Sequence, residues 1–311
     1  MTDYHKTLKE HLKLGDVLRL TDLDSKKEGL YQEGKLIWGE EIASPSLIET
    51  IKPEPQLVIF GAGHISKAIS DIAHILAMRT TVLDEREEML SEERFPHSER
   101  ILMPYKRMFS THFPFFRPYF IILTHGHAHD KDALRYCLSQ SFSYIGMIGS
   151  KGKVISTLDE LALEGIERQL LSSVHAPIGI KIGAQSPEEI AISIIAEVIG
   201  CYRKDKNMVN ISPEYLMKAS GKRGISVRII EKKGSAPRQV GSEMLVMETG
   251  VYGTIGGGAI EKNAIETAQS LLKDDSVFEI RSHRLSSAGD LGMICGGDVT
   301  LLYQLRAPEK Q

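Results

Sequence analysis

Hydrophobic positions in the middle of the chain alternate between short apolar runs and longer stretches with helical spacing. The run LVIF (57–60) is apolar throughout, as in a strand buried on both faces, and Ile65, Ile69 and Ile72 follow at intervals of four and three. Further predicted elements are strands over 80–84, 119–125 and 144–150 and helices over 131–140 and 151–163. This alternation predicts an α/β fold with a Rossmann-like parallel sheet and helices on both of its faces.

The clearest helix start in the sequence is Ser186-Pro187-Glu188-Glu189. Serine can cap the free amides of the first turn, proline suits the first helical position, and Glu189 completes a capping box. Apolar spacing then predicts a helix that continues to about Tyr202. The charged run RKDKN (203–207) indicates a boundary directly after this helix.

The two ends of the chain have a different pattern from the middle. Residues 209–311 contain short apolar strands separated by glycine turns, with one helical stretch at about 260–273, which predicts a smaller α+β domain. Residues 1–50 form a strand-rich segment, and residues 51–208 form the Rossmann-like domain, entered through the proline-containing linker IKPEP (51–55). No internal repeat is visible.

Composition excludes several classes of protein. The formal net charge of −3 over 311 residues offers no broad attraction for nucleic acid or for an anionic membrane. No apolar run is long enough to span a bilayer, and the polar start does not resemble a signal peptide. The three cysteines are far apart and show no zinc-site or disulfide spacing, so we expect a cytoplasmic protein.

A glycine turn follows the first buried strand and suggests a nucleotide site. In LVIF-GAGHIS, Gly61 permits a tight turn and Gly63 lets the backbone approach a pyrophosphate at the start of a helix. Ser66 stands at the third position of this fingerprint, where a small residue is needed. Asp84 ends the second strand, where an acidic residue would bind a ribose hydroxyl, and Arg86 leaves open whether NAD or NADP is preferred.

The segment THGHAHD (124–130) brings three histidines to the end of a predicted strand. It is similar to the His-x-His-x-Asp-His run of dinuclear metallo-hydrolases, but here His129 precedes Asp130. The favoured interpretation is a polar loop in which Asp130 caps the helix that begins near Lys131. Metal-dependent hydrolysis at His125, His127 and His129 is a further alternative.

Three glycine-rich segments of the last domain are typical of ligand loops. Arg238 lies in KGSAPRQVGSEM (233–244), and Gly256, Gly257 and Gly258 precede a helix that carries Glu261. The third segment, DLGMICGGD (290–298), places Cys295 among glycines, where a thiolate would be accessible to a metal. The glycine turn before the helix is expected to expose backbone amides to an anion.

Together these motifs resemble the xanthine dehydrogenase accessory factor family over most of residues 55–303. The resemblance rests on GAGHISKAI, VLDER, ERFP, THGHAHD, YIGMIGSKGK, VHAPIGIKIGAQSPEEIAISI, GSAPRQVG, GTIGGGAIE and GMICGGDV. In that family the glycine-loop module usually precedes the Rossmann domain, whereas here it follows, as in a circular permutation. The resemblance therefore implies that the small domain is built from both chain ends.

The resemblance also implies a function. It predicts a chaperone that binds the molybdenum cofactor (molybdopterin), aids its sulfuration and delivers it to a molybdenum hydroxylase such as xanthine dehydrogenase. A cysteine desulfurase is an implied further partner, and a homodimer is the implied assembly. Cys295 would contact the metal and Arg238 the phosphate. The alternative from the dinucleotide turn is an NAD(P)-dependent oxidoreductase, with His125 and His127 as the candidate proton donors.

Overall fold

The computed structural model describes residues 3–52, 55–115, 118–204, 208–234, 238–284 and 297–308. The chain divides into two compact units. One is Glu54–Asp205, and the other combines Met1–Pro53 with Lys206–Gln311. The N-terminal segment thus belongs to the same unit as the C-terminal glycine-loop module.

The middle unit is a Rossmann-like domain, which confirms the predicted fold class. Its five strands are β5 (Gln56–Phe60), β6 (Arg79–Asp84), β7 (Glu99–Leu102), β8 (Tyr119–Ile122) and β9 (Tyr144–Met147). All neighbouring strands are parallel, in the order β7-β6-β5-β8-β9. The chain runs outward in opposite directions from β5, so the ends of β5 and β8 form the switch point where such sheets bind ligands.

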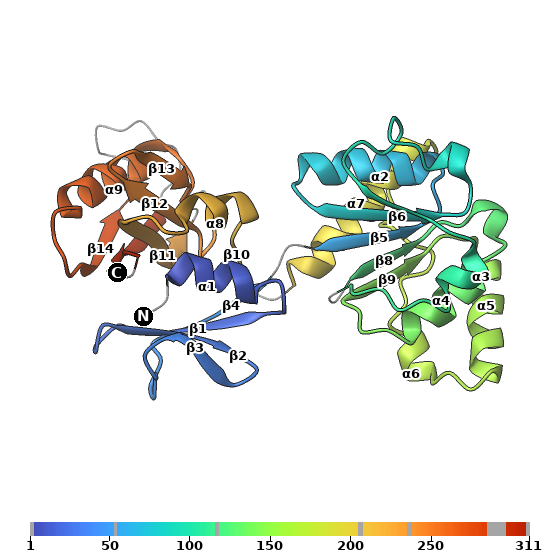
Figure 1. Cartoon of the computed structure of the whole chain (residues 1–311), viewed down its shortest axis with the longest axis horizontal. Coiled ribbons are helices and arrows are strands. Elements are labelled where there is room, and N and C mark those ends of the chain that lie inside the picture. The colour runs from blue at the N-terminus through green and yellow to red at the C-terminus, as the bar shows by residue number, and fades with distance from the viewer. Residues whose placement is uncertain are drawn as a thin grey trace. The chain divides into compact units, whose positions relative to one another are not determined.

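Helices cover both faces of this sheet (Figure 1). They are α2 (His64–Ile75), α3 (Tyr105–Met108), α4 (Asp130–Leu138), α5 (Lys151–Leu163), α6 (Arg168–Leu171) and α7 (Pro187–Tyr202), with 3₁₀ turns η1 (Glu87–Met89) and η2 (His125–His127). Helices α4 and α5 share a core with Val58 and Phe60, while α2 packs beside α7. Strands β5, β8 and β9 are largely apolar because they are buried from both sides.

The predicted capping box is confirmed. Ser186 Oγ accepts a hydrogen bond from the Glu189 amide at 3.2 Å, and Glu189 Oε2 accepts from the Ser186 amide at 3.1 Å. The helix ends at Tyr202, as predicted. Strand β7 was not predicted, because its short sequence ERIL has exposed residues at both ends and shows little apolar character.

The second unit contains two five-stranded sheets. Sheet A has the order β10-β4-β1-β2-β3, with β1 (Val17–Asp22), β2 (Lys27–Gln32), β3 (Lys35–Gly39), β4 (Leu47–Lys52) and β10 (Met208–Asn210). Helices α1 (Tyr4–His11) and α8 (Pro213–Ala219) contribute to its core. Since β10 pairs with β4, the two distant parts of the chain share one sheet.

Sheet C is antiparallel and has the order β13-β12-β11-β15-β14. Its strands are β11 (Gly224–Gly234), β12 (Glu243–Met247), β13 (Gly250–Gly253), β14 (Phe278–Arg284) and β15 (Gly297–Arg306). Helix α9 (Gly258–Leu271) packs its buried residues Ile260, Ala264 and Ala268 on this sheet. The five strands and the helix match the predicted α+β module.

A buried ion-pair network joins sheets A and C. Arg19 of β1 binds Glu49 of β4 through two hydrogen bonds of 2.9 and 3.0 Å and reaches Glu243 of β12 at 2.8 Å. Across the same interface, Arg228 and Arg306 bind Glu28 at 2.9 and 2.6 Å. Three arginines and three glutamates balance in charge, as buried ions require.

The network also sets the ionisation of its acids. Burial alone would raise the pKa of Glu28, but Arg306, Arg228 and Arg19 lower that pKa to about 2. With its pKa lowered this far, the Glu28 carboxylate stays charged at neutral pH. The contact between the two sheets therefore depends on charged side chains from both the N-terminal segment and the C-terminal part of the chain.

Candidate functional site

The strands that flank the three predicted ligand loops start or finish at the same end of sheet C. In the ladder, Gly234 at the end of β11 pairs with Gly297 at the start of β15. Gly253 at the end of β13 pairs with Met244 near the start of β12, and Arg284 at the end of β14 pairs with Asp298. The connections β11–β12, β13–α9 and β14–β15 therefore begin or end at one edge.

Of the two side chains predicted to bind the cofactor in this unit, the structure describes Arg238 but not Cys295. Arg238, in the β11–β12 connection, is exposed, and its carbonyl oxygen accepts a hydrogen bond from Lys232 at 3.4 Å. Cys295 lies outside the described residues, so its role stays a prediction. Strand β15 begins two residues after it, at Gly297, at the same edge of the sheet.

The amides of the glycine turn before α9 bind an anion that the chain supplies itself. Glu261 Oε2 accepts hydrogen bonds from the amides of Ile255, Gly256 and Gly257 at 2.9, 3.2 and 3.1 Å, and from the Thr254 hydroxyl at 2.5 Å. Burial opposes ionisation, yet these donors hold the pKa of Glu261 below its ordinary value. The expectation that these amides face an outside anion needs correction, because a carboxylate one turn into the helix satisfies them.

The first turn of the Rossmann unit has the geometry that its glycines require. Gly61 adopts φ +109°, and a Cβ atom there would lie 2.2 Å from the carbonyl oxygen of Leu123 at the end of β8. Gly63 is the N-cap of α2, and a Cβ added to it would meet no atom within 4 Å. The start of α2 is therefore open, and the turn lies against β8 at the switch point.

Asp84 holds this turn in place. Its carboxylate is buried and accepts from the Ala62 amide at 2.6 Å and from Arg86 at 2.9 and 2.7 Å. Although burial alone would raise it, the pKa of Asp84 lies below its usual value because Arg86 and the Ala62 amide donate to the carboxylate. Binding of a ribose hydroxyl by Asp84 stays a prediction, and it requires that Arg86 move away.

The histidines at the end of β8 do not converge. His127 Nδ1 lies 2.7 Å from Asp130 Oδ2, whereas the His129 ring stacks on Tyr105 and the His125 side chain is exposed. Within the described ranges, no group of three His, Cys, Asp or Glu side chains is arranged to hold a metal ion. The geometry therefore does not fit the metallo-hydrolase alternative.

The prediction that Asp130 caps a helix is wrong. Asp130 is the first residue of α4, His129 is the N-cap, and no side chain caps this helix. The buried Asp130 carboxylate instead accepts from the Thr124 hydroxyl at 2.6 Å and contacts His127 and Lys153. A hydrogen bond with Thr124, just after β8, thus takes the place of the predicted helix cap.

Sequence reasoning did not select Tyr105, which also lies at this edge of the Rossmann sheet. Its side chain is buried, and its hydroxyl has no hydrogen-bond partner in the described part of the chain. Burial, followed by the charge of Asp84, raises the pKa of the Tyr105 phenol. No motif signals this residue, because it follows Pro104 in a stretch without periodic pattern.

These observations define a two-unit protein with a Rossmann-like unit and a glycine-loop unit. The XdhC Rossmann domain family matches residues 57–198, and the XdhC and CoxI family matches residues 217–281. The chain therefore belongs to the XdhC and CoxI family, which confirms the resemblance seen in the sequence. No helix in the described ranges has the length and apolar character needed to cross a membrane.

Named relatives share part of the chain. The molybdenum cofactor insertion chaperone PaoD of Escherichia coli is 34% identical over 106 residues, which is 33% of each chain. A probable xanthine dehydrogenase subunit from Bacillus subtilis is 30% identical over 159 residues, covering 49% of this chain and 44% of that protein. The uncharacterized protein YqeB of E. coli is 34% identical over 145 residues, covering 47% of this chain and 27% of YqeB.

A solved structure supports the same relationship. A crystal structure described as a xanthine dehydrogenase of Bacillus halodurans superposes with a TM-score of 0.51 and 25% identity, covering 62% of this chain and 64% of that one. The matched stretches span less than half of the length of each of the three curated relatives.

Proposed function

We propose that this protein binds the molybdenum cofactor and delivers it to a molybdenum hydroxylase of the xanthine dehydrogenase type. The observation that carries the proposal is that the strands flanking the three predicted ligand loops start or finish at one edge of sheet C in a member of the XdhC and CoxI family. The relative PaoD bears the name of a molybdenum cofactor insertion chaperone, which supports the same role.

The residues at this edge suit an anionic metal–pterin compound. Arg238 is exposed, and its guanidinium is a good phosphate partner. The amides of residues 255–257 add no anion site of their own, because they already donate to Glu261. The thiolate of Cys295 would be a soft ligand for the metal. When bound, the cofactor supplies the redox chemistry that the client enzyme uses, and the chain's part is to hold and shield it.

The Rossmann unit would contribute a nucleotide site, with NAD(P) or another dinucleotide as the ligand. The open N-cap Gly63, at the N-terminus of α2 where no side chain caps the helix, suits a phosphate. The buried hydroxyl of Tyr105 is an unused donor at the same edge of the sheet. A cysteine desulfurase and a second copy of the chain are the further partners we propose.

The test compares cofactor retention between cysteine variants. The protein, purified from cells that make the cofactor, is oxidised, and the released fluorescent pterin is measured per mole of chain. We expect Cys295→Ala to lose most of the pterin. The matched control Cys201→Ala removes a thiol on α7 that lies 3.8 Å from His175 Nε2, and this variant should retain the pterin. Equal retention in both variants would remove the proposed role of Cys295.

A second candidate function, an NAD(P)-dependent oxidoreductase, is favoured by one contact. His127, 40% exposed, pairs with the buried carboxylate of Asp130 at the end of β8, an arrangement that orients an imidazole for proton transfer. Tight binding of NADH or NADPH with turnover of a carbonyl substrate, lost in His127→Gln, would favour this function.

A further inference from the structure

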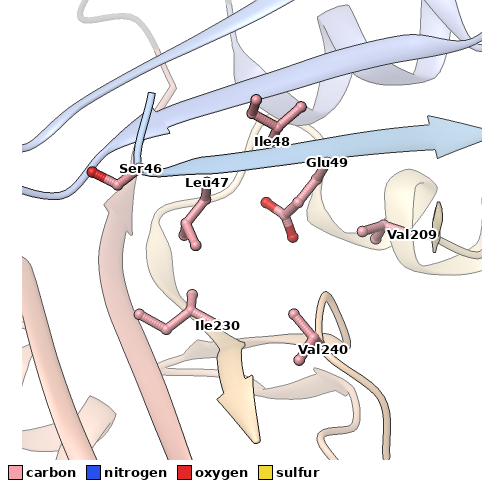
Figure 2. A pocket seen from close by; sticks show the side chains of 7 residues that line it. All are labelled: Ser46, Leu47, Ile48, Glu49, Val209, Ile230 and Val240. Carbon is pink, nitrogen blue, oxygen red and sulfur yellow. The ribbon is translucent and has the colours of Figure 1, made fainter. Parts of the chain in front are cut away.

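A small cavity lies in the two-sheet unit, between β4 of sheet A and the β11–β12 connection of sheet C. Figure 2 shows its lining, which consists of Ser46, Leu47, Ile48, Glu49, Val209, Ile230 and Val240. Its volume is about 180 Å³, against roughly 30 Å³ for one water molecule in the liquid. The space is therefore large enough for part of a small organic ring.

One carboxylate faces this space, which aliphatic side chains and polar groups line together. In Figure 2 the side chain of Glu49 points from β4 towards Ile230 and Val240 on the opposite wall. Glu49 is 7% exposed, and its charge is balanced by Arg19 at 2.9 Å and Arg228 at 3.2 Å. The cavity thus combines aliphatic side chains with a carboxylate that two arginines hold in place.

Glu49 has acceptor capacity that the described part of the chain does not use. Its Oε1 atom accepts one hydrogen bond, from Arg19 Nη2 at 3.0 Å. An ionised carboxylate can accept about four hydrogen bonds over its two oxygens. A ligand that presents neighbouring N–H donors could therefore bind Glu49 without breaking the ion pairs.

The cavity also lies next to the proposed cofactor loops. Val240 and Arg238 belong to the same connection, and the Gly241 amide donates to the carbonyl oxygen of Ile229 at 2.8 Å, which folds this connection back along β11. The cavity wall and the exposed guanidinium are thus two residues apart in the chain.

We propose that this cavity receives the aminopyrimidinone edge of the pterin ring, with Glu49 accepting hydrogen bonds from its 2-amino group and its N3–H. Leu47, Ile230 and Val240 would cover the flat faces of the ring. This inference rests on the proposed function and deepens it, because it assigns a ligand contact to the N-terminal segment, outside both family matches. Guanine carries the same edge, so the experiment includes it.

The test uses a blocking variant that leaves the ion pairs intact. Val240, 41% exposed, is replaced by tryptophan to fill the cavity mouth, and Val251→Trp, at a residue 37% exposed on β13 outside the cavity, is the control. The probe is 6-hydroxymethylpterin, which has no phosphate and so does not depend on Arg238. Binding is measured by equilibrium dialysis. We expect Val240→Trp to weaken binding by roughly tenfold or more and Val251→Trp to leave it within about twofold.

The second arm tests the donor edge. Lumazine carries an oxo group in place of the 2-amino group, so it presents an acceptor to Glu49. We expect lumazine to bind the wild-type protein roughly tenfold or more weakly than the pterin. Equal binding of the two, unchanged binding in Val240→Trp, or tighter binding of guanosine than of the pterin would overturn the inference.

The two proposals fail in different ways. If the purified protein retains the complete cofactor but Val240→Trp does not affect 6-hydroxymethylpterin, the pterin cavity is wrong and the carrier function stands. If the wild-type protein retains no cofactor and binds no pterin, both are wrong.

Discussion

The ion-pair network between sheets A and C gives a prediction that can be worked out in detail. In Glu28→Gln, the negative charge that faces Arg228 and Arg306 is lost, and two buried guanidinium groups keep an excess positive charge. Removing one partner of a buried ion pair costs about 3–5 kcal/mol. We expect the free energy of unfolding of this unit to fall by that amount at pH 7.

The lowered pKa of Glu28 gives a similar estimate of the stability that this residue contributes, and it sets the pH range over which that stability is lost. The pKa is lowered from the ordinary value of 4.5 to about 2 in the folded protein. Since one pKa unit corresponds to about 1.4 kcal/mol, ionised Glu28 contributes about 3 kcal/mol. A lowered pKa means that this contribution is complete above pH 4.5 and is lost as the pH falls towards 2. The difference in the free energy of unfolding between wild type and Glu28→Gln should therefore decrease as the pH falls from 4.5 towards 2.

The assay is urea unfolding followed by tryptophan fluorescence. Trp38 is the sole tryptophan, and it contacts Tyr4 and lies 5.5 Å from the Arg306 guanidinium, so its emission reports on this unit. The control Glu214→Gln removes an exposed acid paired with Lys218 on α8, and we expect it to change stability by less than about 1 kcal/mol. A loss below about 1 kcal/mol in Glu28→Gln, or no pH dependence of the difference, would refute this reasoning.

Two further variants test the glycine turns. Gly61→Ala places a side chain at φ +109° and against the Leu123 carbonyl, so we expect thermal unfolding to show about 2–4 kcal/mol of destabilisation of the Rossmann unit. The control Gly63→Ala should cost less than about 1 kcal/mol, and equal effects of the two variants would contradict the turn geometry. Glu261→Gln loses the charged acceptor of three amides, so we expect a loss of about 1 kcal/mol by Trp38 fluorescence, and no change would mean that the turn does not need this carboxylate.

Local signals in the sequence predicted most of the fold. Short apolar runs predicted β5, β8 and β9 because both faces of that sheet are buried, and the β-branched segment TTVLD predicted β6. The capping box predicted the start of α7. Strand β7 escaped because its end residues, Glu99 and Leu102, are exposed. Asp130 was misread because the helix start made a cap the simplest use for an acid, whereas Thr124 and His127 bind it.

Contacts between distant parts of the chain could not be predicted. Arg19 and Glu243 are 224 residues apart, and nothing in either segment marks the charge as buried. The anion bound by residues 255–257 shows the same limit in a local setting. The glycine turn correctly indicated an amide cluster that binds an anion, but not that Glu261 already fills it, because that depends on side-chain reach. The cavity beside Glu49 likewise exists only where both chain ends meet.

The measurement that addresses the carrier role most directly is the pterin and molybdenum content of the wild-type chain, isolated from a host able to synthesise the cofactor. A carrier should arrive with both in near-equal, substantial amounts per chain and should lose both when the host cannot complete cofactor synthesis. A preparation devoid of pterin and molybdenum from the competent host, although folded by Trp38 emission, would contradict the account.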